Sequence, residues 1–241
     1  MCGRYTNTVG PEELGKTFGV PPGNRLPKPS WSIRPTDTVL ALVAHNGVPQ
    51  PRALRWGLVP SASKSLKGPP LINAKLETID SVYSFRYLVA SASHRALQIA
   101  DGYYEWLKPE HRDGAPQPFH FTVDDGKPFA FAALWTTNDK IEGTPIQSVT
   151  LLTCDPGANR TASSIHNRMP VILADAEARQ TWLDPTATTE EALAVCGALP
   201  ERRLTAKAAN PLLNKAGPED DGPHLLAAPP PEDTERQLAL V

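Results

Sequence analysis

Cys2 follows the initiator methionine, and its small side chain would let a methionine aminopeptidase remove Met1. Removal would leave an α-amine, with a pKa of about 7.7–8.0, and a thiol, with a pKa near 8.5, on one residue. Such a 1,2-aminothiol condenses with an aldehyde, because the amine forms an imine and the nearby thiol closes a five-membered thiazolidine ring. Arg4 could lower the pKa of the thiol by its positive charge. The alternative is an ordinary frayed terminus without chemistry.

Three polar side chains stand in apolar or glycine-containing segments and could assist Cys2: Asn73, Glu105 and His166. Asn73 could orient a carbonyl, an amine or a sugar hydroxyl, or only pin a loop. Glu105 lies between aromatic residues, where desolvation would raise its pKa and suit it to acid–base work, unless it faces water on an edge strand. His166 is of the type best suited to move protons near neutral pH, although a lone histidine is more often structural.

Basic and aromatic residues accompany these groups. Arg4, Lys75 and Arg168 lie beside Cys2, Asn73 and His166 in the sequence, a distribution that could bind phosphate. Trp56 and Trp106 belong either to the core or to a platform on which unpaired bases stack.

The composition is that of an ordinary globular protein of one large domain or two small ones, with 241 residues, 40% hydrophobic and 21% charged. The formal net charge of −2 provides no overall attraction to nucleic acid, but a few placed arginines can bind phosphate locally. Three cysteines without a CxxC pair indicate a reducing cytosol and no disulfide or zinc framework. We find neither a secretion signal nor an apolar run of roughly 18 residues, so we expect a cytoplasmic protein without a membrane span.

The hydrophobic pattern predicts a single α+β domain with a curved or barrel-like antiparallel sheet and flanking helices. We expect helices over 11–19, 80–89, from Asp175 through Leu183, and from the capping box of Thr188 and Glu191 to Leu199. We expect strands over 38–44, over 97–106 with a break at Asp101-Gly102, over 146–154 and over 171–173. The strands 119–123 and 129–135 flank Asp124-Asp125-Gly126, which predicts a hairpin. The domain should span 1–215, and 216–241 should be a Pro-rich acidic tail, disordered at its end.

Five motifs occur in the order seen in one family. They are Met1-Cys2-Gly3-Arg4-Tyr5, Trp56-Gly57-Leu58-Val59-Pro60, Ile72-Asn73-Ala74-Lys75-Leu76-Glu77-Thr78, Ala100-Asp101-Gly102-Tyr103-Tyr104-Glu105-Trp106 and Ile165-His166-Asn167-Arg168-Met169-Pro170-Val171. Over about residues 2–215 the chain resembles the SOS-response-associated peptidase (SRAP) family, whose members shield abasic sites in single-stranded DNA. Each motif is weak by itself, but five in this order are specific.

The resemblance implies that Cys2, exposed by autocatalytic removal of Met1, forms a thiazolidine cross-link with the ring-opened abasic-site aldehyde. It implies that Asn73 holds the cross-linked sugar, that Glu105 shuttles protons, and that His166 opens the sugar ring and supports a weak abasic-site lyase activity. It also implies that Thr153 lies near the reacting centre. Arg4 and Arg168 match phosphate-binding arginines, and no metal or other cofactor is implied.

Two positions depart from the family pattern. Lys75 stands where the family usually has arginine, which keeps the charge but loses bidentate phosphate geometry. Arg34 stands where the family often has a small residue and could compensate.

The expected partner is single-stranded DNA with abasic sites, bound by a monomer that would associate with the nucleoid in a bacterium. Two other functions stay open. One is a cysteine peptidase acting in trans, with Cys2 as nucleophile and His166 as base. The other is a non-covalent single-strand-binding module built on Trp56, Trp106 and the basic residues.

Overall fold

The computed structural model describes residues 2–20, 26–45, 48–108, 115–143 and 145–227. Its strands are β1 (Arg4–Asn7), β2 (Ser30–Ile33), β3 (Thr38–His45), β4 (Val48–Trp56), β5 (Asn73–Lys75), β6 (Arg95–Ala100), β7 (Gly102–Leu107), β8 (Gln117–Val123), β9 (Phe129–Asn138), β10 (Ile146–Cys154), β11 (Met169–Pro170), β12 (Ile172–Leu173) and β13 (Leu204–Ala208). The α-helices are α1 (Pro11–Phe18), α2 (Tyr83–Val89), α3 (Arg160–Ser163), α4 (Ala176–Leu183) and α5 (Thr189–Ala194). The 3₁₀ turns are η1 (Leu76–Thr78), η2 (Ala92–His94), η3 (Glu201–Arg203), η4 (Pro211–Asn214), η5 (Pro218–Asp220) and η6 (Pro223–Leu225).

Five strands close into a barrel in the order β10-β4-β3-β6-β9, because β9 pairs back with β10. The pairs within this ring are antiparallel except β4 with β10, which is parallel. Apolar side chains on both faces of this sheet, such as Leu42, Leu97 and Phe131, have almost no exposed surface and belong to the core. The predicted α+β fold with a barrel-like antiparallel core is therefore confirmed.

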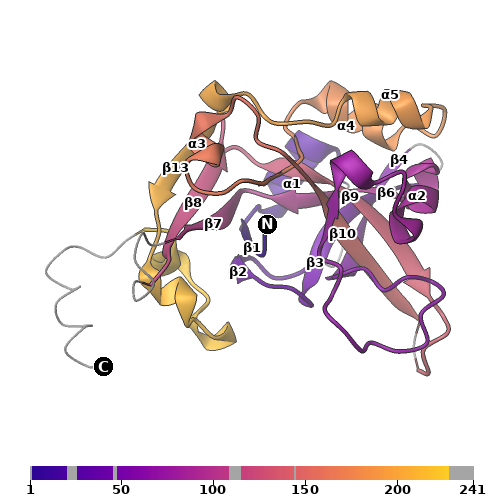
Figure 1. Ribbon diagram of the computed structural model, residues 1–241, viewed down its shortest axis with the longest axis horizontal. Coiled ribbons are helices and arrows are strands. Elements are labelled where there is room, and N and C mark those ends of the chain that lie inside the picture. Colours follow the sequence, from indigo (N-terminus) through magenta and orange to yellow (C-terminus); the bar gives the residue numbers. More distant parts are fainter. Residues whose placement is uncertain (1, 21–25, 46–47, 109–114, 144, 228–241) are drawn as a thin grey trace, which may run out of the picture.

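A second sheet, in the order β13-β8-β7-β1-β2, stands beside the barrel and carries the amino-terminal strand (Figure 1). Asp101 holds the junction of β6 and β7. Its carboxylate accepts hydrogen bonds from the hydroxyls of Thr6 and Thr8, and each of these bonds is 2.5 Å long. The next residue is Gly102, and a larger residue would not fit there because a Cβ would lie only 2.1 Å from Nε2 of His120. The predicted break at Asp101-Gly102 is thus a crossing from the barrel to the second sheet.

The predicted hairpin around Asp124-Asp125-Gly126 is wrong. β8 pairs with β7 and β13, whereas β9 pairs with the barrel strands, so the turn connects two different sheets. Asp124 and Asp125 adopt left-handed φ angles of 44° and 61°. Arg203 binds the carboxylate of Asp124, with a shortest contact of 2.6 Å, and anchors this turn beside β13.

The helices lie close to their predicted places. α1 ends at Phe18 before Gly19, whose φ of 67° suits a left-handed cap, and the Thr188–Glu191 capping box is present. α2 begins three residues later than expected, and α5 ends at Ala194 rather than Leu199. α4 and α5 cover one side of the molecule, and Trp182 of α4 donates a hydrogen bond to the carbonyl of Ala96 on β6 (Figure 1).

The ordered body continues past residue 215. η4, η5 and η6 lie against the second sheet, where Leu213, Ala216 and Leu225 pack with Tyr104 of β7. The expected disorder at the end of the tail falls on 228–241, outside the described residues. Among the helices that the structure describes, none has the length and apolar character needed to cross a bilayer.

Candidate functional site

Cys2 and Asn73, which are 71 residues apart in the chain, meet at the start of β1. Nδ2 of Asn73 donates a hydrogen bond of 3.0 Å to the backbone carbonyl of Cys2. Asn73 opens β5, which pairs in parallel with β10 at Leu151. The residue before it is held by Trp56, whose indole N–H donates to the carbonyl of Ile72 over 3.1 Å. The position of Cys2 therefore depends on the barrel wall.

The thiol of Cys2 has no exposed surface and lies among core residues. Burial raises the pKa of the Cys2 thiol well above its usual value, and the negative charge of Glu105 adds to this. The expectation that Arg4 lowers this pKa is wrong, because the guanidinium of Arg4 is directed to Oγ of Ser32, over 2.8 Å. The sulfur therefore stays protonated at neutral pH.

Glu105 lies on β7 next to the amino-terminal strand. Arg4 pairs with Tyr104, so the next position along the antiparallel register sets Glu105 opposite Gly3, one residue from Cys2. Only 4% of Glu105 is exposed, and burial raises the pKa of its carboxyl to about 7. The predicted desolvation is confirmed, and the carboxyl is poised to gain or lose a proton near neutral pH.

His166 and Arg168 lie in the loop between α3 and β11. The backbone N–H of Arg168 donates to Nδ1 of His166 over 3.0 Å, so the neutral ring carries its proton on Nε2. Burial is the main cause that lowers the pKa of His166. This loop is tied to β10, because Nη2 of Arg168 donates to the carbonyl of Thr153 over 2.7 Å.

Arg168 also forms a bidentate ion pair with Glu77, with contacts of 2.8 and 2.9 Å. This contact holds the pKa of Glu77 at about 2. The predicted phosphate-binding arginine is thus occupied by a carboxylate in this structure. Lys75, which pairs with Thr153 across β5 and β10, is exposed beside it.

The two predicted stacking residues differ. Trp56 is completely buried and packs edge-on against Tyr5, with ring centroids 5.2 Å apart, so the prediction of a stacking surface does not hold for it. Trp106 is partly exposed and donates to Oδ1 of Asn214 over 2.8 Å.

The predicted site residues therefore form two neighbouring groups. Cys2, Asn73 and Glu105 form the first, and Thr153, Lys75, Arg168 and His166 form the second. Asn73 and Lys75 share β5, and both pair along β10, so this strand holds the two groups side by side.

Sequence reasoning missed two contacts. Glu77 stands inside a motif that the sequence analysis singled out, but nothing in the pattern indicated that it would pair with Arg168. Ser32 carried no signal for its bond to Arg4, which only the pairing of β1 with β2 brings about.

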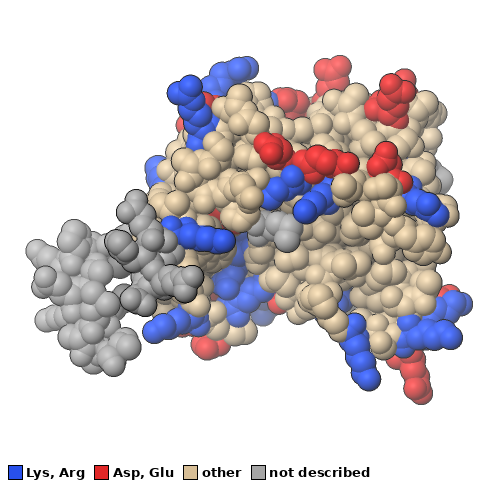
Figure 2. All heavy atoms as spheres, viewed as in Figure 1, with Lys and Arg blue, Asp and Glu red and all other residues tan. Residues whose placement is uncertain are grey.

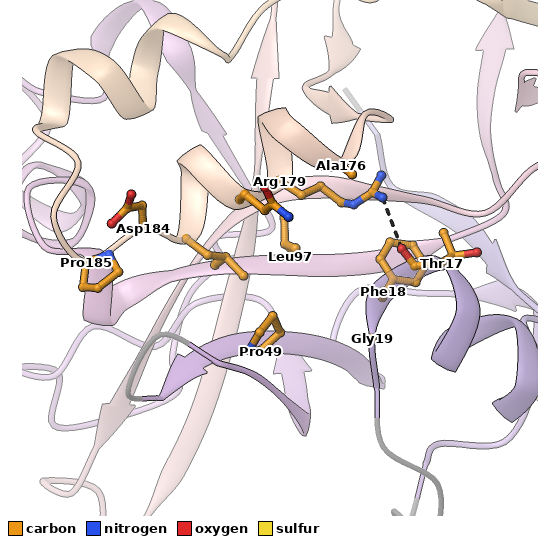
Figure 3. A pocket seen from close by; sticks show the side chains of 11 residues that line it. Thr17, Phe18, Gly19, Pro49, Leu97, Ala176, Arg179, Asp184 and Pro185 are labelled. Carbon is orange, nitrogen blue, oxygen red and sulfur yellow. Dashed lines mark hydrogen bonds between the residues drawn. The ribbon is translucent and has the colours of Figure 1, made fainter.

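A cavity of about 660 Å³ lies elsewhere, between α1, α4 and β6 (Figure 3). Arg179 at its wall donates to the carbonyl of Thr17 over 3.2 Å, and its guanidinium lies 5.0 Å from the centre of the Phe18 ring. It also donates to the carbonyls of Leu173 and Ala174. These contacts bind the guanidinium of Arg179 to the main chain of the protein itself. Within the described part of the chain, no cluster of three or more His, Cys, Asp or Glu residues could hold a metal ion.

The fold and this arrangement define a protein of the SRAP class. Residues 1–216 match the family described as SOS response associated peptidase (SRAP), and the chain belongs to that family. Abasic site processing protein YoqW of Bacillus subtilis (strain 168) is 32% identical over 198 residues, covering 80% of this chain and 84% of that protein. Abasic site processing protein YedK of Escherichia coli (strain K12) is 27% identical over 216 residues, covering 85% and 90%.

Solved structures agree on the fold. A crystal structure of a Bacteroides thetaiotaomicron protein superposes with a TM-score of 0.78 at 18% identity, covering 95% of this chain and all of that one. A Bordetella bronchiseptica protein superposes with a TM-score of 0.73 at 27% identity, covering 87% of this chain and all of that one.

Proposed function

We propose that this protein processes abasic sites by binding single-stranded DNA and joining Cys2 covalently to the ring-opened sugar. The observation that carries the proposal is that Asn73 and Glu105, which come from separate segments, both lie next to Cys2. The names of the relatives YoqW and YedK support abasic sites as the substrate.

The chemistry needs the α-amine of Cys2, which becomes free when Met1 is lost. The amine adds to the sugar aldehyde, and loss of one water gives an imine. The sulfur then forms a bond to the imine carbon while its proton passes to the nitrogen, which closes the thiazolidine ring. The proton of the S–H group ends on the nitrogen, so the step conserves atoms and charge without another reagent.

Glu105 and His166 would move the protons. A carboxyl with a pKa of about 7 is present in both forms near neutral pH, so Glu105 can give a proton to the departing water and take it back in the reverse reaction. Nε2–H of His166 can donate to the ring oxygen of the closed sugar and so help it open. We also assign to His166 a weak lyase activity, in which the sugar carbon next to the imine loses a proton and the 3′-phosphate leaves. Asn73 fixes the main chain of Cys2 during these steps.

The two other functions are less well supported. A peptidase acting in trans needs a thiolate, and burial makes the Cys2 thiolate costly. A non-covalent stacking module loses Trp56, which has no exposed face. Autocatalytic removal of Met1 remains part of the proposal. The intact masses of the wild type and of Glu105→Gln, each checked for the loss of one methionine, test it.

The decisive experiment incubates processed protein with an oligonucleotide that contains one abasic site. We expect a heat-stable adduct from the wild type and none from Cys2→Ala. Cys2→Ser keeps the amine without the sulfur, so it should yield an imine that is stable only after borohydride reduction. A heat-stable adduct formed as readily by Cys2→Ala would overturn the proposal.

A further inference from the structure

Two arginines face each other across the edge of the second sheet. Tyr5 of β1 pairs with Ile33 of β2, so the adjoining position of this antiparallel register sets Arg4 opposite Arg34. Like charges directly opposite in a sheet are destabilising unless another group neutralises them. Burial lowers the pKa of the Arg4 guanidinium and the positive charge of Arg34 lowers it further, while the negative charge of Asp37 acts in the opposite direction.

Among the described residues, neither guanidinium forms an ion pair with a carboxylate. Arg4 donates to Oγ of Ser32, and Arg34 donates to the carbonyl of Gly217. The nearby carboxylate of Asp37 accepts from the backbone N–H of Arg34, over 2.8 Å, rather than from its side chain. Nε of Arg34 is buried and has no hydrogen-bond partner. The pair therefore keeps two positive charges and one unused donor.

The pair also lies beside the reacting residue. Arg4 is two positions from Cys2, and its backbone carbonyl is 3.8 Å from the Cys2 sulfur. Figure 2 shows Lys and Arg side chains gathered over β1 and β2, where this face of the molecule is hollowed. Arg168 and Lys75 stand on the other side of Cys2, near β10, and Arg168 is occupied by Glu77.

We propose that Arg4 and Arg34 together form a binding site for a backbone phosphodiester of the DNA strand, immediately beside the abasic nucleotide. The proposal rests on the proposed function and adds Arg34 as a phosphate-binding residue. An anion between the two guanidiniums removes the cross-strand repulsion and supplies the acceptor that Nε of Arg34 lacks. Lysine at position 75 binds phosphate only as a point charge, and the bidentate geometry that an arginine would give there is supplied by Arg34 on the opposite side of the site.

The test measures affinity for an undamaged single-stranded oligonucleotide as a function of salt, with no covalent step involved. Each phosphate contact contributes about 0.7 to the slope of log K against log salt for single strands. We expect Arg34→Gln to reduce the slope by about 0.7 and to weaken binding several-fold at low salt. Arg34→Lys should keep the slope, and Arg202→Ala, an exposed arginine on η3, should change neither quantity.

The thermal midpoint of each variant separates binding from folding. A structural role for Arg34, through Gly217, would lower the midpoint of Arg34→Gln and leave the salt slope at the wild-type value, and that result would overturn the proposal. The adduct assay reports on the proposed function independently. If the wild type forms no adduct but Arg34→Gln still reduces the salt slope as expected, covalent capture is refuted and the phosphate site stands.

Discussion

The side-chain amide of Asn73 donates a hydrogen bond of 3.0 Å to the backbone carbonyl of Cys2, so the second residue of the chain is positioned by β5. Both residues are otherwise fixed by separate elements: Asn73 by pairing with β10, and Cys2 by its place before β1. Chain termini ordinarily fray, because nothing restrains their backbone. This contact converts a terminus into part of a site.

The first prediction concerns this contact. Asn73→Ala should slow adduct formation about fivefold, since a neutral hydrogen bond contributes about 1 kcal/mol and its loss frees the main chain of Cys2. Single-turnover rates on an abasic oligonucleotide measure the effect. Asn7→Ala, which removes a side-chain contact to the N–H of Val9 at the other end of β1, is the matched control and should react at the wild-type rate. Equal rates for Asn73→Ala and wild type would contradict this role.

The second prediction concerns the dependence of stability on pH. The pKa of Glu105 is raised from 4.5 to about 7 by burial, so the folded protein holds this proton more tightly than the unfolded chain. The stabilisation is full below pH 4.5 and is lost as the pH rises through 7, by roughly 3 kcal/mol in total. Glu105→Gln should remove this loss, which denaturant unfolding at pH 5 and pH 8 would measure.

Glu12→Gln, an exposed carboxyl on α1, is the control for this measurement and should leave the pH dependence unchanged. Both substitutions replace a carboxyl by an amide of nearly the same shape, so a difference between the two variants reports on the surroundings of the two carboxyls. If Glu105→Gln and the wild type lose equal stability between pH 5 and pH 8, Glu105 is not a desolvated carboxyl.

The third prediction concerns the ion pair of Glu77 with Arg168. The pKa of Glu77 is lowered to about 2, so its contribution to stability is present above pH 4.5 and is lost as the pH falls toward 2. Because 45% of the Glu77 side chain is exposed, solvent screens the pair. Glu77→Gln should therefore lower the free energy of unfolding at pH 7 by only about 1 kcal/mol, and by less in high salt.

Denaturant titrations at pH 7 and pH 2.5 check this expectation. The difference between Glu77→Gln and wild type should shrink at the lower pH, where the carboxylate begins to be protonated. Asp139→Asn removes an exposed carboxylate paired with Lys140 and should cost less at pH 7. A pH-independent difference would show that Glu77 acts through packing rather than charge.

The fourth prediction concerns the protonation of His166. Its Nδ1 accepts the backbone N–H of Arg168 over 3.0 Å, so the neutral imidazole should carry its proton on Nε2. Nitrogen-15 chemical shifts of the ring in protein labelled at histidine would identify the tautomer. His94, whose Nδ1 lies 3.1 Å from the carbonyl of Trp135, should show the opposite tautomer and serves as an internal reference. An Nδ1–H form of His166 would contradict its proposed role as a donor from Nε2.

Local patterns predicted most elements because they depend on neighbours in the chain. The capping box of Thr188 and Glu191 and the strand 146–154 were predicted correctly for this reason. The hairpin around Asp124 was not, because turn residues show that the chain reverses but not which strand it then pairs with. The choice between core and stacking platform for Trp56 stayed open for a related reason: a tryptophan looks the same in the sequence whether it is buried or exposed.

The sequence by itself determined which reactive groups the chain owns: a cysteine at position 2, a carboxyl between aromatics, an imidazole and their accompanying cations. Only the tertiary structure decided how these groups behave, because pKa and contact depend on distances across elements. It buried the thiol of Cys2, directed the guanidinium of Arg4 to Ser32, paired Arg168 with Glu77, and set Arg34 opposite Arg4. Strand register, which no local pattern specifies, is the physical reason for the difference.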